Sequence, residues 1–324
     1  MSIVSVVSSS YQDARIGLEK AIRSSGGLPM QDHDKVIIKI NFCDARTADT
    51  GAVTHPAFLD ALLAYLSENY SDMPIYVIES DATVVLADEF VRWLGYQEVL
   101  DKWGVPFVNL SKDDATVRRI NGLYFSELPV PHIFDNAFYI TQAKLKTNSL
   151  SQITCSLKNQ YGCMPEVIKS TYHTVLDEAI ADVNLAYHPD FCIVDGILGH
   201  GGIQGPAFGT PIPAGIIIAG KDPVATDIVC ARAMGIPPWL VGHIKTSIKV
   251  GIGSPKYQLV GGPLPKVDFH ANLVGMMVFK LGTNLKKRSD LRIRKRSRFG
   301  RTSMPGSAGS MHCHRATQTE GELR

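Results

Sequence analysis

The sequence lacks long hydrophobic runs. Although 45% of its 324 residues are hydrophobic, no apolar stretch approaches the ~20 residues that a membrane-spanning helix needs. The first ten residues, MSIVSVVSSS, contain no basic side chain and only a short apolar run, which argues against a signal peptide. We therefore expect a protein that does not enter a membrane.

Cysteines are few and widely separated. They stand at positions 43, 155, 163, 192, 230 and 313, and no two form a Cys-x-x-Cys pair. This spacing excludes the ligand patterns of zinc ribbons and ferredoxin-type clusters, and the HCH triplet at 312–314 is too compact and isolated to define a metal site. Isolated thiols are typical of a reducing compartment, so we expect a cytoplasmic protein. The sequence predicts no metal or iron–sulfur site and leaves any cofactor unknown.

Basic charge is scarce outside one segment. The formal net charge is +2, yet residues 283–324 hold eleven of the 33 basic residues and three of the 31 acidic ones. The rest of the chain then carries 22 basic and 28 acidic residues, a net charge of −6. A mildly acidic body without a basic stripe argues against nucleic acid as a partner, except for weak binding through the basic tail.

What the sequence does have is a regular alternation of strands and helices. In the first half, β-branched runs predict strands at 3–8, 35–42, 74–80 and 106–110, and amphipathic stretches predict helices at 11–24, 56–69 and 87–103. Segments of this length in this order indicate an α/β fold with a largely parallel sheet and helices on both faces.

The second half continues less regularly. It predicts strands at 137–145, 191–195 and 214–219, and helices at 166–185, 222–234 and 239–250. In the helix 222–234, Asp222 fits the N-cap, Pro223 the first turn and Gly235 the position after the end. We expect one domain over 1–282, built of two intimately packed lobes at about 1–115 and 116–282. Residues 283–324 are expected to form a disordered, basic, low-complexity tail.

Polar residues follow the second predicted strand. Lys39 and Asn41 lie on one side of it, and Thr54, His55 and Pro56 open the next helix. Because ligands bind outside the carboxyl ends of parallel strands, Lys39 and Asn41 are candidates to hold a carboxylate or phosphate, and His55 to bind an anion or move a proton. The alternative is a lysine that caps the sheet and an asparagine in a turn.

The segment SLKNQYGCMP, residues 156–165, suggests a second set. Lys158 and Asn159 in a turn before a helix can reach an anion, and Gly162 allows the backbone to approach a ligand closely. Cys163 is a nucleophile only if its pKa is lowered; otherwise it is a small packed residue. We select Lys158, Asn159 and Gly162 as ligand-binding candidates.

The helix predicted at 166–185 places Lys169, His173 and Asp177 in one row, four residues apart. A cation, an imidazole and a carboxylate in that order are suited to proton transfer, with Asp177 orienting His173. The alternative is an exposed row of charged side chains. We therefore name His173, His55 and Lys169 as the catalytic candidates.

Acidic residues near the last strands complete the candidates. Asp195 and Gly196 end a predicted strand and open a glycine-rich link, which is either a backbone nest for an anion or a structural loop. Asp222 is explained by its N-cap role alone. Asp227 has no basic residue four positions on, so it faces either a polar cavity or solvent. Asp195, Gly196, Asp222 and Asp227 are kept as ligand-binding candidates.

Taken in order, KVIIKINF, AVTHPAFLDALLAYL, SLKNQYGCMP, FCIVDGI and AGKDPVATD resemble the family known as domain of unknown function 362. The resemblance covers about residues 35–253. Many members carry a ferredoxin-like iron–sulfur module that is absent here, which weakens an electron-transfer role. At fold level only, the N-terminal pattern is also similar to the nickel-pincer lactate racemase family. The family has no general activity, so the resemblance implies positions rather than a mechanism: Lys39, Asn41, His55, Pro56, Lys158, Asn159, Gly162, Lys169, His173, Asp195, Gly196, Gly205, Pro206, Asp222, Pro223 and Asp227.

Two functions are consistent with the sequence. The first is an enzyme that binds a small anionic metabolite or cofactor in a cleft between the lobes. Such an enzyme would use acid/base chemistry or be associated with oxidoreductases. The second is a non-catalytic accessory or binding protein for a redox or maturation system, with the basic tail contacting a redox protein partner.

Overall fold

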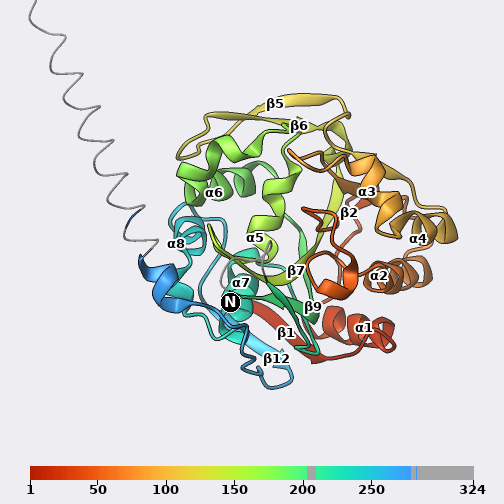
Figure 1. The fold of residues 1–324 in the computed structure, drawn as a ribbon. Coiled ribbons are helices and arrows are strands. Elements are labelled where there is room, and N and C mark those ends of the chain that lie inside the picture. Colours follow the sequence, from red (N-terminus) through yellow and green to blue (C-terminus); the bar gives the residue numbers. More distant parts are fainter. Residues whose placement is uncertain (203–208, 279–281, 283–324) are drawn as a thin grey trace, which may run out of the picture. The chain divides into compact units, whose positions relative to one another are not determined.

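The β-branched runs of the sequence become the strands of one large sheet (Figure 1). The computed structural model describes residues 1–202, 209–278 and 282, and Met1–Val278 form one unit. Gly205, Pro206 and the tail 283–324 lie outside the described residues. The strands are β1 (Ser2–Ser8), β2 (Lys35–Lys39), β3 (Ile75–Glu79), β4 (Phe107–Asn109), β5 (Ala115–Arg119), β6 (Glu127–Pro131), β7 (Ala137–Asn148), β8 (Gln152–Thr154), β9 (Phe191–Gly201), β10 (Thr210–Ile212), β11 (Ile216–Gly220) and β12 (Tyr257–Gly261).

Within the described residues, ten of these strands form a sheet whose main order is β12-β1-β11-β9-β7-β2-β3-β4, with β10 beside β9 and β8 beside β7. The neighbours from β9 to β4 are parallel, and so are β1 and β12. Only β11 runs against both of its main neighbours. The expectation of an α/β fold with a mostly parallel sheet is confirmed. Since β1 pairs with β11 and β12, this sheet includes segments from both expected lobes.

The helices cover the two faces of the sheet. They are α1 (Ala14–Ser24), α2 (Pro56–Asn69), α3 (Ala87–Trp93), α4 (Tyr96–Trp103), α5 (Ser156–Asn159), α6 (Leu176–Ala186), α7 (Pro223–Ala233) and α8 (Gly242–Lys249), with 3-10 helices η1 (Ala48–Thr50), η2 (His132–Phe134), η3 (Gln160–Cys163), η4 (Lys169–Val175) and η5 (Pro238–Leu240). Buried residues of α1–α4 pack with Val36 and Ile38 of β2, whereas those of α5–α8 pack in a second cluster with Ile37. Successive residues of β2 thus serve opposite faces.

Three predicted helices differ from the structure. The helix expected at 87–103 divides into α3 and α4 at Gly95, which has a φ of +79°. The helix expected at 239–250 starts only at Gly242. The helix expected at 166–185 starts at Leu176, and the preceding KSTYHTV is the 3-10 helix η4, since its threonines, aromatic residues and valine are weak α-helix formers.

The caps of α7 are as predicted. The Asp222 carboxylate accepts from the backbone amides of Val224 and Ala225 at 2.9 and 3.0 Å, and Gly235 follows the helix with a φ of +69°. A left-handed residue at this point is the usual end of a helix, and glycine adopts it without strain.

Candidate functional site

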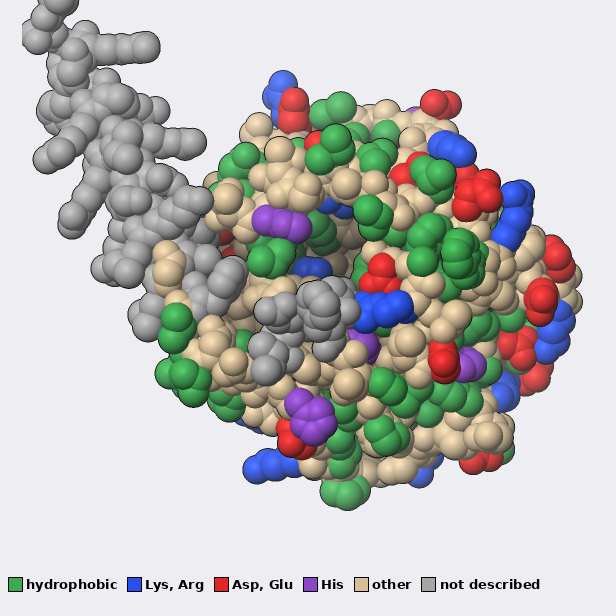
Figure 2. Space-filling view, in the orientation of Figure 1, with side chains coloured by type: hydrophobic (Ala, Val, Ile, Leu, Met, Phe, Trp, Pro, Cys, Tyr) green, Lys and Arg blue, Asp and Glu red, His purple; other side chains and the backbone are tan. Residues whose placement is uncertain are grey.

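A cavity of about 310 Å³ lies where β2, β3 and β7 end. These three strands are parallel neighbours, so their carboxyl ends meet at one edge of the sheet, the place where open α/β sheets bind ligands. The space-filling view shows a hollow on this face, surrounded by apolar, histidine and charged side chains (Figure 2). The lining comprises Lys39, Asn41, Phe42, Cys43, Glu79, Ser80, Ala82, Thr83, Val84, Lys146, Asn148, Thr154, Lys158, Asn159, Tyr161, Gly162, Val167, Lys169, Ser170 and His173.

The two polar sets expected from the sequence meet at this cavity. The side-chain amide of Asn41 donates to Oδ1 of Asn159 over 2.9 Å, although the two residues are 118 positions apart. Asn159 in turn donates to the backbone oxygen of Lys39 and to the hydroxyl of Thr141. Both asparagines are buried, and these hydrogen bonds satisfy polar atoms that would otherwise be costly to bury. This network joins the end of β2 to α5.

Lys39 is held in an ion pair at the floor of the cavity. Its ammonium group lies 2.6 Å from Oε1 of Glu79, and both side chains are almost fully buried. Lys39 also donates to the backbone oxygen of Ile40 at 2.9 Å. Burial raises the pKa of Glu79, and the positive charge of Lys39 opposes that change. The two opposite charges neutralise each other, so Lys39 attracts an external anion only weakly.

Lys146, at the end of β7, is a cavity residue that the sequence did not single out. Its ammonium group donates to Oδ1 of Asn41 and to the backbone oxygen of Ala52, both at 2.7 Å, and lies 3.5 Å from Sγ of Cys43. These partners are neutral dipoles, so the charge of Lys146 is solvated but not cancelled. Lys144 and Lys146 alternate with apolar residues, but only the structure shows that their strand is buried throughout, so the sequence alone carried no sufficient signal.

Lys169 also points to the cavity with neutral partners. It donates to the hydroxyl of Ser80 at 2.9 Å and to the backbone oxygen of Asp81 at 2.6 Å. Burial is the largest influence on this group and lowers the pKa of Lys169 to about 8. The prediction that Lys169, His173 and Asp177 form one row along a helix is wrong. The segment η4 is not an α-helix, and the Asp177 carboxylate lies against Gly242 at the start of α8.

Lys158 differs from the other cavity lysines, because its ammonium group has no hydrogen-bond or ion-pair partner among the described residues. Its side chain is partly exposed, and burial together with the charge of Lys146 lowers its pKa to about 8. His173 lines the same cavity, and burial followed by the nearby Lys158 lowers its pKa below the usual value. A neutral imidazole thus stands near an amine that loses its proton easily.

Gly162 keeps this space open. A Cβ atom at this position would lie 2.9 Å from Nζ of Lys39 and 3.0 Å from Oε1 of Glu79, distances at which the ion pair would have to move. Cys163 is fully buried, and burial raises the pKa of its thiol to about 11. A thiol in that state is a packed residue rather than a nucleophile.

His55, Asp195 and Gly196 lie outside the cavity lining. The Asp195 carboxylate forms a fully buried ion pair with Lys144 at 2.6 Å, and the ring of His55 stacks on Tyr11 with 3.9 Å between ring centres. Nδ1 of His55 accepts from the backbone amide of Ala57 and so caps α2. The structure therefore brings His55 and Asp195 together, with the His55 backbone amide 3.4 Å from the Asp195 carboxylate, but in a group that does not line the cavity.

Asp222 and Asp227 also lie outside the lining, and both hold helices. Besides capping α7, the Asp222 carboxylate accepts from Ser2 and Ser254. The two oxygens of Asp227 accept from the backbone amides of Ser156 and Leu157, at 2.7 and 3.1 Å. These amides begin α5, so Asp227 fixes the helix that carries Lys158 and Asn159.

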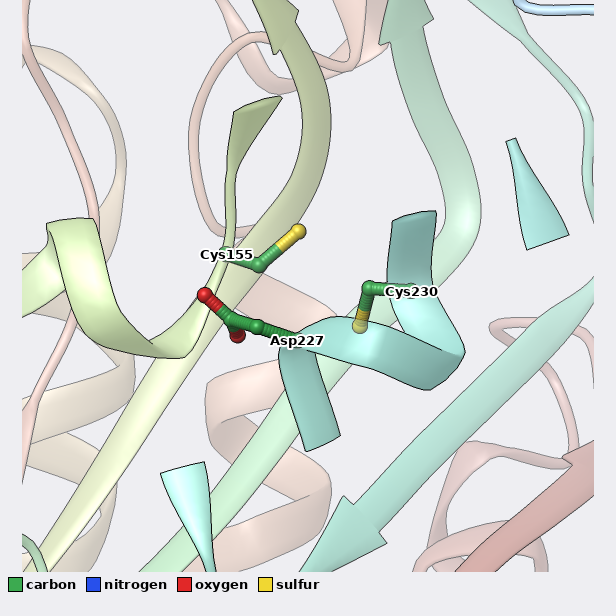
Figure 3. Close-up of side chains that lie close together, drawn as sticks. All are labelled: Cys155, Asp227 and Cys230. Atoms are coloured by element: carbon green, nitrogen blue, oxygen red, sulfur yellow. The ribbon is translucent and has the colours of Figure 1, made fainter. Parts of the chain in front are cut away.

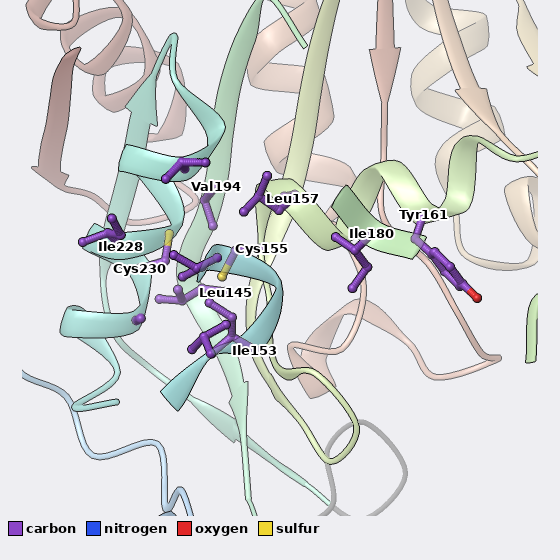
Figure 4. Packing of buried hydrophobic residues seen from close by; sticks show 14 of the residues in the cluster. Leu145, Ile153, Cys155, Leu157, Tyr161, Ile180, Val194, Ile228 and Cys230 are labelled. Carbon is purple, nitrogen blue, oxygen red and sulfur yellow. The ribbon is translucent and has the colours of Figure 1, made fainter. Parts of the chain in front are cut away.

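The thiols of Cys155 and Cys230 lie within 4.8 Å of the Asp227 carboxylate and of each other (Figure 3). A cysteine pair with a carboxylate is a possible ligand set for a metal ion. Both thiols, however, pack among aliphatic side chains such as Leu145 and Ile153 (Figure 4), and burial raises the pKa of each. We therefore assign the two cysteines to packing and Asp227 to the support of α5.

The charges around the cavity do not balance. Among the described lining residues, four are lysines and one, Glu79, is acidic. Glu79 is paired with Lys39, so the four ammonium groups of the described lining outnumber its carboxylates by three. An excess of ammonium groups around a small hollow attracts negative charge.

The fold and site define an α/β protein with a basic cavity at the carboxyl ends of parallel strands. The family described as "Domain of unknown function (DUF362)" matches residues 36–232, and the chain belongs to this family, as the sequence motifs predicted. The chain is 23% identical over 240 residues to the thylakoid-associated protein sll1697 of Synechocystis sp. (strain ATCC 27184 / PCC 6803 / Kazusa), which covers 70% of this chain and 71% of that protein.

Among solved structures, the chain is similar to the lactate racemase apoprotein from Thermoanaerobacterium thermosaccharolyticum. The match has a TM-score of 0.43 at 12% identity and covers 72% of this chain and 57% of the racemase chain. The chain thus spans somewhat more than half of that protein. No helix in residues 1–202 and 209–278 is both long and apolar enough to span a bilayer.

Proposed function

We propose that the cavity binds a small anionic metabolite or cofactor. The observation that carries this proposal is the surplus of lysines around one hollow, with Lys158 lacking a partner among the described residues. A volume of about 310 Å³ is at the lower end of the range for ligand sites, which favours a small molecule. Lys146, Lys158 and Lys169 supply the positive charge, and Asn148 adds an amide at the rim.

The same cavity contains a group suited to proton transfer. His173 lines the cavity with an exposed side chain, and its lowered pKa favours the neutral imidazole near pH 7. A neutral imidazole accepts a proton from a bound ligand or from Lys158. This supports an acid/base enzyme over the non-catalytic accessory role, because an accessory anion site does not need a titratable group beside its cation.

The experiment is a thermal-shift assay with anions of increasing charge: glycolate, inorganic phosphate and pyrophosphate, each against sodium chloride at equal ionic strength. A ligand that binds only the folded state raises the melting temperature with concentration. We expect Lys158→Ala and His173→Ala to lose this increase while the melting temperature without ligand stays nearly unchanged, since neither side chain supports its neighbours through a hydrogen bond within the described residues.

Lys245 provides the control. It is exposed on α8 and does not line the cavity, so Lys245→Ala removes one charge from the surface and should respond to anions like the unaltered chain. The site assignment fails if Lys158→Ala and His173→Ala lower the stability of the ligand-free protein but keep the anion response.

We also propose a cytoplasmic location. The cysteines of the described residues are all free, which suits a reducing compartment. The cyanobacterial relative is named for its association with thylakoids. Localisation of a tagged chain in its own cells therefore decides between a cytoplasmic and a membrane-associated location.

A further inference from the structure

Lys158 is distinguished by what its amine does not contact. Each of the other three cavity lysines donates to at least two oxygen atoms at 2.6–2.9 Å: Lys39 to Glu79 and Ile40, Lys146 to Asn41 and Ala52, and Lys169 to Ser80 and Asp81. These hydrogen bonds hold each of the three lysines as an ammonium group. An ammonium group has no lone pair and cannot attack a carbon atom. Among the four lysines of the described lining, Lys158 alone has no such oxygen partner within the described residues.

The backbone of Lys158 is nevertheless firmly held. Asp227 accepts from the amides of the two residues before it, and Asn159, the residue after it, is tied to β2 and β7 by hydrogen bonds. A rigid support with a free side-chain end is the arrangement that a reactive group needs, because the support fixes where the amine can reach.

The surroundings also favour the neutral amine. Burial and the neighbouring Lys146 lower the pKa of Lys158 to about 8, so at pH 7 its neutral fraction is roughly two-hundredfold that of an exposed lysine. His173, in the same cavity, is available to take the proton that leaves the ammonium group. Desolvation next to a second cation is a known way to make a lysine nucleophilic.

We propose that Lys158 forms an imine with the carbonyl carbon of a small anionic oxo acid, whose negative group lies against Lys146 and Lys169. This inference rests on the proposed function, because the anion site must bring the carbonyl group to the amine. The Lys158 nitrogen attacks the carbonyl carbon and a carbon–nitrogen double bond forms. The carbonyl oxygen leaves as water with the two remaining amine protons. No electrons are gained or lost, so no oxidant or reductant is needed.

Reductive trapping of the full chain tests this step. Glyoxylate, which carries one aldehyde and one carboxylate, is added at pH 7 with sodium cyanoborohydride, and the digested protein is mapped by mass spectrometry. An imine at Lys158 becomes a stable carboxymethyl-lysine. We expect Lys158 to be modified at least about tenfold faster than the exposed Lys245, in line with its larger neutral fraction. Equal rates at the two lysines would overturn the inference.

Glycolate and one variant separate this inference from the proposed function. Glycolate has the carboxylate but no aldehyde or ketone with which an amine can condense, so it should slow trapping at Lys158 without affecting Lys245. Lys158→Arg keeps the positive charge and should keep the glycolate-dependent rise in melting temperature while it loses the adduct in the cavity. A melting-temperature response without preferred trapping at Lys158, or an adduct at Lys146 or Lys169 instead, refutes the imine alone. If glycolate gives neither a temperature response nor protection of Lys158, the anion site fails as well.

Discussion

At the scale of single residues, the Lys39–Glu79 pair decides the charge of the cavity floor. Glu79 is the one carboxylate in the described lining, and it neutralises Lys39, one of the lysines that the sequence proposed for ligand binding. Had Lys39 been free, the site would hold a fourth uncompensated cation. The pair therefore leaves anion binding to the other three lysines of the described lining, Lys146, Lys158 and Lys169.

Glu79→Gln should be strongly destabilising. The change leaves the Lys39 ammonium buried without a counter-charge, and breaking a buried pair by removing one partner costs about 3–5 kcal/mol. Denaturant titration at pH 7 measures this loss. The double variant Lys39→Met, Glu79→Leu removes both charges together and should recover much of the stability. A single variant as stable as the unaltered chain would show that the pair is solvated rather than buried.

The residues of the cavity were predictable where a polar side chain followed a recognisable strand or turn. Lys39, Asn41, Lys158 and Asn159 stood out for that reason, and the structure brings all four to one cavity. Lys146 did not stand out, because a lysine inside a strand is expected to face solvent unless both faces of the strand are known to be buried. The sequence also could not show that Glu79 would neutralise Lys39, since that contact depends on β2 and β3 being neighbours.

At the scale of elements, α5 and α7 act as a unit. α5 is a single turn, too short to be stable by itself, and Asp227 of α7 accepts the hydrogen bonds of its first two amides. The link was invisible in the sequence, where Asp227 looked like a residue without a partner. Through this link the titratable carboxylate of Asp227, which does not line the cavity, contacts the helix that carries Lys158.

Asp227 should make the stability of the protein pH-dependent. Burial raises its pKa from 3.8 to about 7. Because the folded state then binds the proton more tightly than the unfolded state, the stabilisation is complete below pH 4 and is lost as the pH rises towards 7. The expected loss between pH 5 and 8 is about 2–3 kcal/mol, measured by denaturant titration at both values.

Asp227→Asn provides the comparison for this slope. The amide keeps one oxygen to accept from α5 but does not titrate, so the variant should lose the Asp227 part of the pH dependence. Within the described part of the chain, His243, whose Nε2 lies 3.9 Å from the carboxylate, and Asp222 are ionisable groups that act on Asp227 besides the buried thiols. A slope that persists unchanged in Asp227→Asn would assign it to one of those groups.

At the scale of the whole molecule, the order of the strands creates the site. The end of β7 reaches the cavity only because β7 lies beside β2, although more than ninety residues separate them in the sequence. The alternation of strands and helices was sufficient to predict a mostly parallel sheet with helices on both faces. It was not sufficient to predict that β1 would lie between β11 and β12, since strand pairing is decided by long-range packing that no local pattern records.

Removal of the basic tail tests which part of the chain carries the function. All described residues of the cavity lie between Lys39 and His173, within the unit Met1–Val278, so a chain ending at Gly282 should keep both the anion-dependent rise in melting temperature and preferred trapping at Lys158. Under the accessory alternative the basic segment contacts a redox protein partner, and deletion should abolish that binding instead. The comparison uses thermal shift and trapping on the full and shortened chains in parallel. If the shortened chain folds with an unchanged melting temperature but no longer responds to anions, the cavity is not the binding site, because charge supplied from residues 283–324 was then responsible for the response.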